Sequence, residues 1–212
     1  MYNNVIEAKM TDRGTVIHTF NDGTTKKYSA VKAGLSWPTP TSPGYFVILG
    51  EEQRSHTKFE GVKQQRGKLI LLTEYESQSP FLDDLVPKFS DSCSLYYCSY
   101  VYADLREEHK DEADPFREWY YDSGGGGTSL CEGSFIDSFS LGVSLIRKWL
   151  DERLLVLPEN SIAREQLKKI TGPDLEDSPE TRFFAVNGLR FVIAAFHKYQ
   201  PSNLVGWTPN RS

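Results

Sequence analysis

The sequence has few of the residues that bind zinc or form disulfide frameworks. Its 212 residues include three cysteines, Cys93, Cys98 and Cys131, which are odd in number and show no Cys-x-x-Cys spacing. The four histidines lie far apart along the chain, at positions 18, 56, 109 and 197. This pattern argues against a zinc site and predicts reduced, mostly buried thiols, as in a reducing cytosol.

Long apolar runs are also absent. No stretch approaches the roughly 18 apolar residues that indicate a membrane span. The first residues, Met1-Tyr2-Asn3-Asn4, lack the charged and then apolar pattern of a secretory signal. We therefore expect a soluble chain with no membrane partner, which stays in the compartment where it is made.

The chain has no excess of positive charge. Its formal net charge is −5, from 24 Lys and Arg and 29 Asp and Glu. A protein that binds nucleic acid without sequence preference usually carries a basic balance or a basic stripe. Here the basic residues are dispersed in short groups, such as Lys26-Lys27, Arg147-Lys148 and Lys168-Lys169. The composition neither shows nor excludes a nucleic-acid partner, and it argues against tight autonomous binding.

A nucleotide-binding loop is absent as well. The four consecutive glycines at 124–127 are not followed by Gly-Lys-Ser/Thr, and the chain carries no Walker A sequence. The glycine run therefore predicts a flexible loop and not a phosphate cradle.

What the sequence does contain is a series of short β-type segments. Residues 5–10, 15–20 and 24–31 are separated by two turn sequences, Asp12-Arg13-Gly14 and Asn21-Asp22-Gly23. Glycine after a short polar residue is typical of tight hairpin turns. These segments predict a small antiparallel β meander at the N-terminus.

The meander precedes a longer α/β pattern. We expect residues 1–28 to be an appendage, residues 29–199 the main domain and residues 200–212 a tail. The apolar runs at 45–49 and 68–75 predict strands that are covered on both faces.

A helix and a further strand follow. Ser79-Pro80 is typical of a helix start, and residues 94–103 are rich in aromatic and β-branched side chains, which predicts a strand ending at Asp104. A strand, a helix and a second strand imply a parallel crossover, and sites in open α/β sheets gather at the carboxyl ends of such strands. Asp104 is therefore a candidate site residue; the alternative is a carboxylate that caps a loop at the strand end.

The second half of the chain is mostly helical in pattern. Helices are expected to start at Asp114-Pro115, Ser138, Asn160 and Ser178-Pro179. Residues 154–157 predict a short edge strand. The highly charged segment 106–114 is predicted to be solvated. Strands interleaved with helices indicate the α/β class.

Several short motifs resemble the RNase H-like nuclease half of phage terminase large subunits. Ala33-Gly34-Leu35-Ser36-Trp37 is similar to the first strand of that domain, which reads small-Gly-hydrophobic-Asp-Trp-Gly. Tyr102-Ala103-Asp104 resembles the end of its fourth strand. Phe183-Phe-Ala-Val-Asn-Gly-Leu-Arg-Phe191 looks like its last-helix signature, Asp-His-Ala-hydrophobic-Asp-Ala-Leu-Arg-Tyr. The resemblance covers residues 29–199 and implies a mixed sheet flanked by helices, without the ATPase half.

The resemblance also implies a metal site, and most of the carboxylates of that site are absent from this sequence. Such nucleases hold two divalent ions between carboxylates, and Mg²⁺ and Mn²⁺ prefer hard oxygen ligands. Carried over by motif, the family's acid positions become Ser36, Asp104, Phe183 and Asn187. Asp104 is the one carboxylate among them and hence the one metal ligand expected. The resemblance thus predicts a catalytically impaired domain, a pseudoenzyme.

A rearranged set of acids is the alternative. Glu74 near the end of a predicted strand is the first candidate to join Asp104, followed by Glu51, Glu52 and Asp137. Such a set would make the chain an active endonuclease that depends on Mg²⁺ or Mn²⁺.

Three functional hypotheses follow from the sequence. The first is an impaired terminase-nuclease relative that acts in binding or assembly during viral DNA packaging or processing, with DNA and packaging or virion proteins as partners. The second is the active endonuclease with rearranged acids. The third is a structural virion or accessory protein, in which Trp119-Tyr120-Tyr121 forms a partner-binding patch or packs against the sheet. The resemblance implies the host cytoplasm or the virion as the location.

Overall fold

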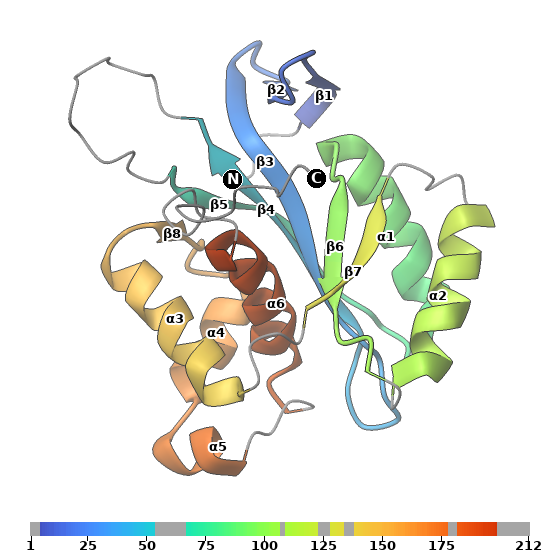
Figure 1. Cartoon of the computed structure of the whole chain (residues 1–212), viewed down its shortest axis with the longest axis vertical. Coiled ribbons are helices and arrows are strands. Elements are labelled where there is room, and N and C mark those ends of the chain that lie inside the picture. The colour runs from blue at the N-terminus through green and yellow to red at the C-terminus, as the bar shows by residue number, and fades with distance from the viewer. Residues whose placement is uncertain are drawn as a thin grey trace, which may run out of the picture.

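The chain folds as a mixed β-sheet with helices on both of its faces (Figure 1), which confirms the α/β class. The computed structural model describes residues 5–53, 67–106, 109–122, 128–133, 138–177 and 182–198. None of the helices in these ranges has both the length and the apolar character that a membrane crossing requires.

The sheet has a path of six strands with two more strands beside it. In order, β1 pairs with β2, β2 with β3, β3 with β4 and β4 with β5, all antiparallel, and β8 joins β5 in parallel. Off this path, β6 runs parallel to β3, and β7 runs parallel to β6. The strands are β1 (Val5–Met10), β2 (Val16–Phe20), β3 (Thr25–Ser36), β4 (Tyr45–Glu52), β5 (Leu69–Glu76), β6 (Tyr100–Ala103), β7 (Ser129–Glu132) and β8 (Leu155–Val156).

The long strand β3 organises this sheet. One edge of β3 pairs with β4 between residues 28 and 36. The other edge is shared, because residues 25–28 pair with β2 and residues 32–34 pair with β6. β3 therefore runs across the boundary expected between residues 28 and 29, and the N-terminal meander and the main sheet have a strand in common.

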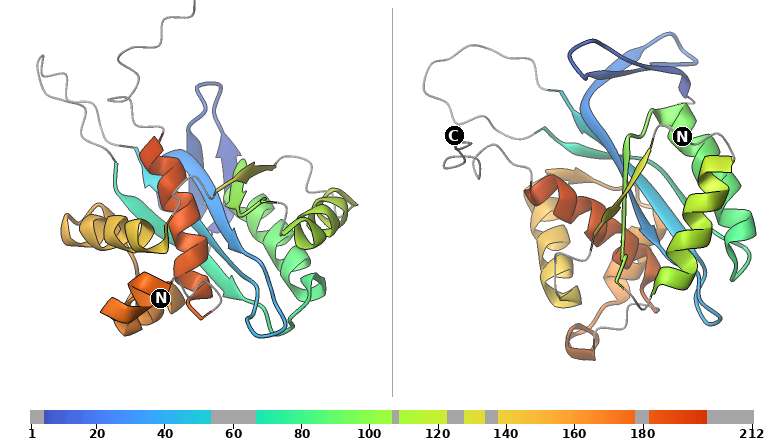
Figure 2. Two further views of the ribbon diagram at one scale, coloured as in Figure 1. Left: turned by 60° about the horizontal axis from the view of Figure 1, so that its bottom comes forward. Right: turned by 45° about the vertical axis from the view of Figure 1, so that its right-hand side comes forward.

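Two helical layers cover the sheet (Figures 1 and 2). The alternation of side chains in β4 explains why both faces are apolar: Tyr45, Val47 and Leu49 enter one core, and Phe46 and Ile48 enter the other. This confirms the expectation of a strand covered on both faces. One layer is α1 (Leu82–Tyr96) and α2 (Lys110–Asp122), and the other is α3 (Phe139–Asp151), α4 (Ile162–Lys169), α5 (Gly172–Asp177) and α6 (Phe184–Lys198).

The strand expected at 94–103 is wrong in its first half. Helix α1 continues to Tyr96 and ends at Tyr97, which has a left-handed φ of 57°. The strand β6 occupies Tyr100–Ala103 alone. The buried side chains of α1, including Phe89 and Cys93, keep the helical spacing against the sheet, so packing overrides the β propensity of the aromatic residues.

Several element ends also differ from expectation. Ser161, and not Asn160, caps α4 by accepting a bond from the backbone N–H of Arg164. Ser138 caps α3 as expected, by accepting from Leu141. Strand β7 has no counterpart among the expected strands, because its four residues bury little apolar surface. The glycine run 124–127 and the expected helix start at 178–180 lie outside the described residues.

Helix α6 crosses β3 at a contact between two glycines. A Cβ added to Gly34 would lie 2.0 Å from the carbonyl oxygen of Gly188 and 3.1 Å from the Cβ of Val192. Only a residue without a side chain allows the helix backbone to approach the strand this closely. The glycine in the motif Ala33-Gly34-Leu35 therefore sets how near α6 lies to the sheet.

His18 links the meander to α1. Its ring is fully buried, its Nε2 atom donates to the carbonyl oxygen of Tyr96 at 2.8 Å, and it packs against the rings of Tyr28 and Tyr96. Its Nδ1 atom is buried and has no hydrogen-bond partner in the described part of the chain. Burial lowers the pKa of His18 below 6.5, and the bond to Tyr96 opposes this shift in part.

We predict that this histidine makes the fold sensitive to mild acid. Because the pKa of His18 is lower in the folded than in the unfolded chain, the unfolded chain binds more protons below about pH 6.5, and the free energy of unfolding falls there. Urea denaturation at pH 7.5 and 5.5 should show this loss for the wild type and a smaller loss for His18→Gln, which keeps a donor. His197→Gln, at an exposed position, should behave as the wild type; an equal loss in all three proteins would contradict the assignment.

Candidate functional site

Three of the four positions named by the resemblance meet at one small cavity. Ser36 ends β3, Asp104 follows β6 directly and Asn187 lies in the first turns of α6. The cavity has a volume of about 50 Å³, and its walls are formed by Ser36, Trp37, Thr39, Ser42, Asp104, His109, Asn187 and Phe191. The structure thus brings together segments that are about 70 to 80 residues apart in the sequence.

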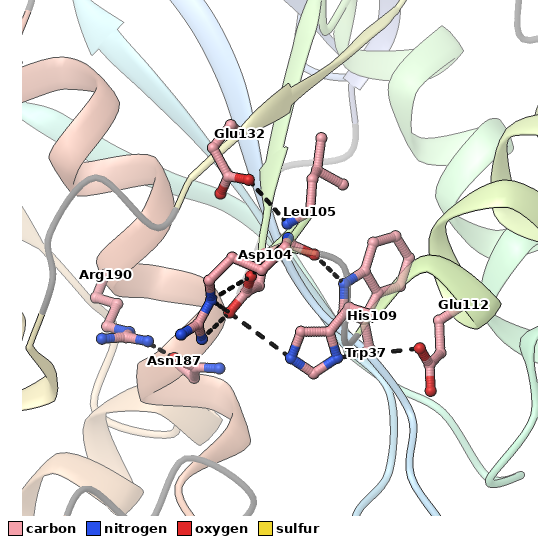
Figure 3. Close-up of polar contacts among 9 residues, drawn as sticks. Trp37, Asp104, Leu105, His109, Glu112, Glu132, Asn187 and Arg190 are labelled. Carbon is pink, nitrogen blue, oxygen red and sulfur yellow. Dashed lines mark hydrogen bonds and ion pairs between the residues drawn. The ribbon is translucent and has the colours of Figure 1, made fainter.

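Asp104 is held at this site by the loop that follows it (Figure 3). The Nε atom of Arg106 donates to both carboxylate oxygens of Asp104, at 2.9 and 3.0 Å, and Nη2 donates to Oδ2. The backbone N–H of Arg106 donates to Oδ1 at 3.1 Å. Asp104 therefore accepts hydrogen bonds from the loop that follows it.

The surroundings keep this carboxylate charged. Burial raises the pKa of Asp104, but the bonds from Arg106 and the nearby His109, whose Nε2 lies 3.7 Å from Oδ2, outweigh burial and leave the pKa below its ordinary value. Both oxygens already accept hydrogen bonds. A divalent ion would have to displace the guanidinium of Arg106 before it could use them.

The loop also fixes the backbone around Asp104. The indole N–H of Trp37 donates to the Asp104 carbonyl oxygen at 2.6 Å, and the carboxylate of Glu132 on β7 accepts from the backbone N–H of Leu105 at 3.1 Å. These contacts tie the ends of β3, β6 and β7 together (Figure 3). The position of Asp104 is thus determined by three strands and not by its own loop alone.

The other two family positions at the cavity carry no charge. Ser36 and Asn187 are 5% and 7% exposed. The side-chain oxygen of Asn187 accepts a hydrogen bond from Nε of Arg190, a buried cation that also packs over the ring of Phe191 at 4.8 Å. Asn187 is therefore bonded to a guanidinium, whose positive charge would repel a metal ion.

The fourth family position and the proposed second acid lie elsewhere. Phe183 is buried in the core, where its ring stacks on Phe139 at 6.1 Å. The carboxylate of Glu74 lies at the N-terminus of α4. It accepts hydrogen bonds from the backbone N–H of Ile162 at 2.9 Å and from the hydroxyl of Tyr45 at 2.7 Å. A carboxylate at a helix N-terminus stabilises the unpaired N–H groups there.

The register of the sheet separates Glu74 from Asp104. Glu74 lies opposite Val47, Val47 opposite Gly34, and Gly34 opposite Tyr102. Three strand spacings correspond to about 14 Å, whereas the two ions of a two-metal site lie roughly 4 Å apart. The structure does not bring these two acids together.

The remaining acid candidates do not complete the site either. Glu51 pairs with Ala30 in the register and accepts from the hydroxyl of Ser29 at 2.8 Å, so it lies at the far end of β3 from Ser36. Glu52 lies beside it, 3.9 Å from the ammonium of Lys26. Asp137 lies outside the described residues.

The residues present do not fit a pair of divalent ions. Within the described ranges, no group of three or more His, Cys, Asp and Glu side chains is arranged to hold a metal. At the cavity, Asp104 faces a guanidinium, a serine and an amide, which together lack the negative charge that two divalent ions require.

No protein-family model and no curated protein matches this sequence. The geometry of the cavity therefore carries the functional inference.

The aromatic cluster of α2 does not form one exposed patch. Trp119 is 44% exposed, whereas Tyr120 is buried and stacks on Phe116 at 5.9 Å. For Tyr120 the packing interpretation is confirmed. The side chain of Tyr121 lies outside what the structure describes.

Three residues at or beside the site were not expected from the sequence. The segment 106–114 was predicted to be solvated, yet Arg106 and His109 face Asp104. The available signal was local: a basic residue two positions after a strand-end aspartate is well placed to bond it. Arg190, buried at 2% exposure, lies three residues after Asn187 on the same helix face.

Proposed function

We propose that this chain is a non-catalytic relative of the RNase H-like nuclease domain of phage terminase large subunits. It acts as a binding or assembly component in viral DNA packaging, in the host cytoplasm or in the virion, with DNA and packaging or virion proteins as partners. One observation carries this proposal: the Asp104 carboxylate is bound by Arg106 in a cavity whose other acid positions are Ser36 and Asn187.

The order of the elements supports an RNase H-like arrangement. Three antiparallel strands, β3, β4 and β5, are followed by α1, β6, α2 and β7, and the last two strands run parallel to β3. Ser36 and Asp104 lie side by side because β6 pairs with β3 on the edge away from β4. The cavity therefore occurs where the motif comparison expects the reacting centre of the family.

The chemistry of the cavity supports the loss of catalysis. Two-metal hydrolysis needs one ion to activate water and another to stabilise the leaving oxygen. The guanidinium of Arg106 donates hydrogen bonds and brings positive charge, but it stays protonated and accepts no proton from water. Asp104, with a lowered pKa and both oxygens bonded, is also a weak general base.

A plasmid-nicking assay tests the proposal. We expect supercoiled DNA incubated with the protein and Mn²⁺ to remain intact, at the level of a metal-only control and of Asp104→Ala, because no metal pair assembles at the cavity. Densitometry of agarose gels over a range of protein concentrations gives the rate. Metal-dependent nicking by the wild type that Asp104→Ala abolishes would overturn the proposal and favour an active endonuclease with rearranged acids.

A further inference from the structure

The basic residues of the chain are unevenly divided between its two parts. Residues 1–68 contain ten Lys and Arg and six Asp and Glu, a net charge of +4, whereas residues 69–212 contain 14 and 23, a net charge of −9. Together these give the −5 of the whole chain. Most of this excess lies at residues 54–66, which contain four Lys and Arg and one Glu. Residues 1–28, which include the meander, contain four Lys and Arg and three Asp and Glu, a net charge of +1.

The pairing register places two of these cations on one face of the meander. Lys9 lies opposite Ile17, and Ile17 lies opposite Lys27, and residues directly opposite each other in a sheet share a face. His18 and Tyr28, which lie in the rows on either side of this one, pack toward α1 on the opposite face. Lys9, Ile17 and Lys27 therefore face away from α1, with Glu7 as the acid of the adjacent row.

A hollow of about 360 Å³ opens beside this row. It is formed by Thr11, Asp12, Arg13, Thr15, Ile17, Lys27 and Gln53. We name the surface made by this hollow and Lys9 the meander face. The hairpin of β1 and β2 lies at one end of the molecule, and α5 lies at the other (Figures 1 and 2).

The cations of the meander face are not neutralised by the protein. Lys9, Arg13 and Lys27 are exposed and form no ion pair with any described residue. By contrast Lys26, on the other side of the strand, lies 3.9 Å from a carboxylate oxygen of Glu52. These three side chains are therefore available for an external anion.

We propose that the meander face binds the phosphate backbone of duplex DNA. This inference rests on the proposed function, which makes DNA the partner, and it adds where the contact lies. Phosphates are bound in proteins by Lys and Arg together with Ser, Thr and Gln side chains, and the meander face offers Lys9, Arg13 and Lys27 beside Thr11, Thr15 and Gln53.

Two further features favour DNA over an acidic protein. Protein interfaces are centred on aromatic or apolar anchors, and the hollow contains one apolar side chain, Ile17, which is half-buried. Residues 69–212 carry a net charge of −9, so a polyanion is repelled by that part of the chain.

The meander face is separate from the cavity at Asp104. Lys27 and Ser36 lie nine positions apart on β3, and at about 3.3 Å per residue the strand places them roughly 30 Å apart. A phosphate held at the meander face therefore does not itself reach the cavity.

Fluorescence anisotropy with a labelled 20-base-pair duplex tests this inference. With about three phosphates neutralised, the logarithm of the association constant should fall with the logarithm of salt concentration at a slope of about −2.7. Arg13→Glu with Lys27→Glu should weaken binding at least tenfold at 50 mM salt and reduce that slope by about 2. Asp12→Asn should strengthen binding, because it removes the acid of the hollow.

A charge-matched control separates a local contact from a global effect. Lys88→Glu with Lys169→Glu changes the net charge by the same amount at exposed positions of α1 and α4, and it should change binding by less than about twofold. Circular dichroism and melting temperature check that all variants fold. An equal loss in the control pair, or unchanged binding by Arg13→Glu with Lys27→Glu, would overturn the inference.

The outcome is independent of the catalytic proposal. Failure of the wild type to bind the duplex at 50 mM salt would overturn the inference about the meander face. The non-catalytic proposal would still be judged by the nicking assay. Nicking with Mn²⁺ would instead refute the non-catalytic assignment, while the effect of Arg13→Glu with Lys27→Glu on binding could still be measured. Displacement of DNA by poly-glutamate at equal charge would overturn the preference for DNA over an acidic protein.

Discussion

Replacing Gly34 by alanine is expected to destabilise the protein by about 3 kcal/mol, the upper end of the range for an overpacked core. The new Cβ would meet the carbonyl oxygen of Gly188 at 2.0 Å and the backbone carbon of the same residue at 3.0 Å. Because these are backbone atoms of a buried helix, no rotamer change relieves the contact, and α6 must move away from β3. A melting temperature lower by about 6–12 °C should follow for a chain of this size.

Gly172→Ala is the matched control for this change. An added Cβ at Gly172 meets no atom within 4 Å, and its φ is not in the left-handed region. This variant should therefore melt within about 2 °C of the wild type, since it adds a methyl group in open space. If Gly34→Ala were as stable as the control, α6 would not lie against β3 as closely as the structure has it.

The strands could be predicted where a run of apolar side chains is buried. Residues 45–49 form a continuous apolar run, and the strand β4 buries this run on both faces. The end of α1 could not be predicted in the same way, because Tyr96, Tyr97 and Tyr100 have the same β propensity although the first is helical and the last is in a strand. What separates them is contact with the sheet, which a local pattern does not contain.

The cavity could be predicted in part. The motif comparison named Ser36, Asp104 and Asn187, and these three residues line one space. It could not place Glu74, whose partner Ile162 is 88 residues away. A surface acid, a metal ligand and a helix cap look alike in a sequence, and the position of α4 against β5 decides among them.

Arg106 gives the neutral residues of the cavity a common physical explanation. A lone carboxylate at a buried position needs a counter-charge. In a metal site divalent ions supply it, and here a guanidinium two residues along the chain supplies it. Because Arg106 holds Asp104, the neutral side chains of Ser36 and Asn187 avoid a repulsion that further acids at the cavity would introduce.

This explanation predicts that a metal site can be built at the cavity. We expect the triple variant Ser36→Asp, Asn187→Asp and Arg106→Ala to bind Mn²⁺, whereas the wild type does not. Three carboxylates would then line one cavity and provide the oxygen ligands that Mn²⁺ prefers. Arg190, which already donates to the side-chain oxygen at position 187, would hold one of the new carboxylate oxygens and leave the other for the ion.

Thermal unfolding measures this gain directly. Without metal, the triple variant should be less stable than the wild type, because Ser36 and Asn187 are more than nine-tenths buried and clustered acids repel each other. Mn²⁺ at about 100 times its dissociation constant should then add about 2.7 kcal/mol, which raises the melting temperature by about 5–10 °C. Isothermal titration calorimetry gives the dissociation constant itself.

The variant Ser36→Ala, Asn187→Ala and Arg106→Ala is the control, since it removes the same side chains and adds no carboxylate. Its melting temperature should not respond to Mn²⁺, because Asp104 alone offers too few ligands. A triple aspartate-alanine variant that ignores Mn²⁺ would show that the three positions are not within reach of one ion, and the proposed relation to a metal nuclease would fail. An equal response in the wild type would mean that Mn²⁺ displaces Arg106 from Asp104, and catalysis would have to be reconsidered.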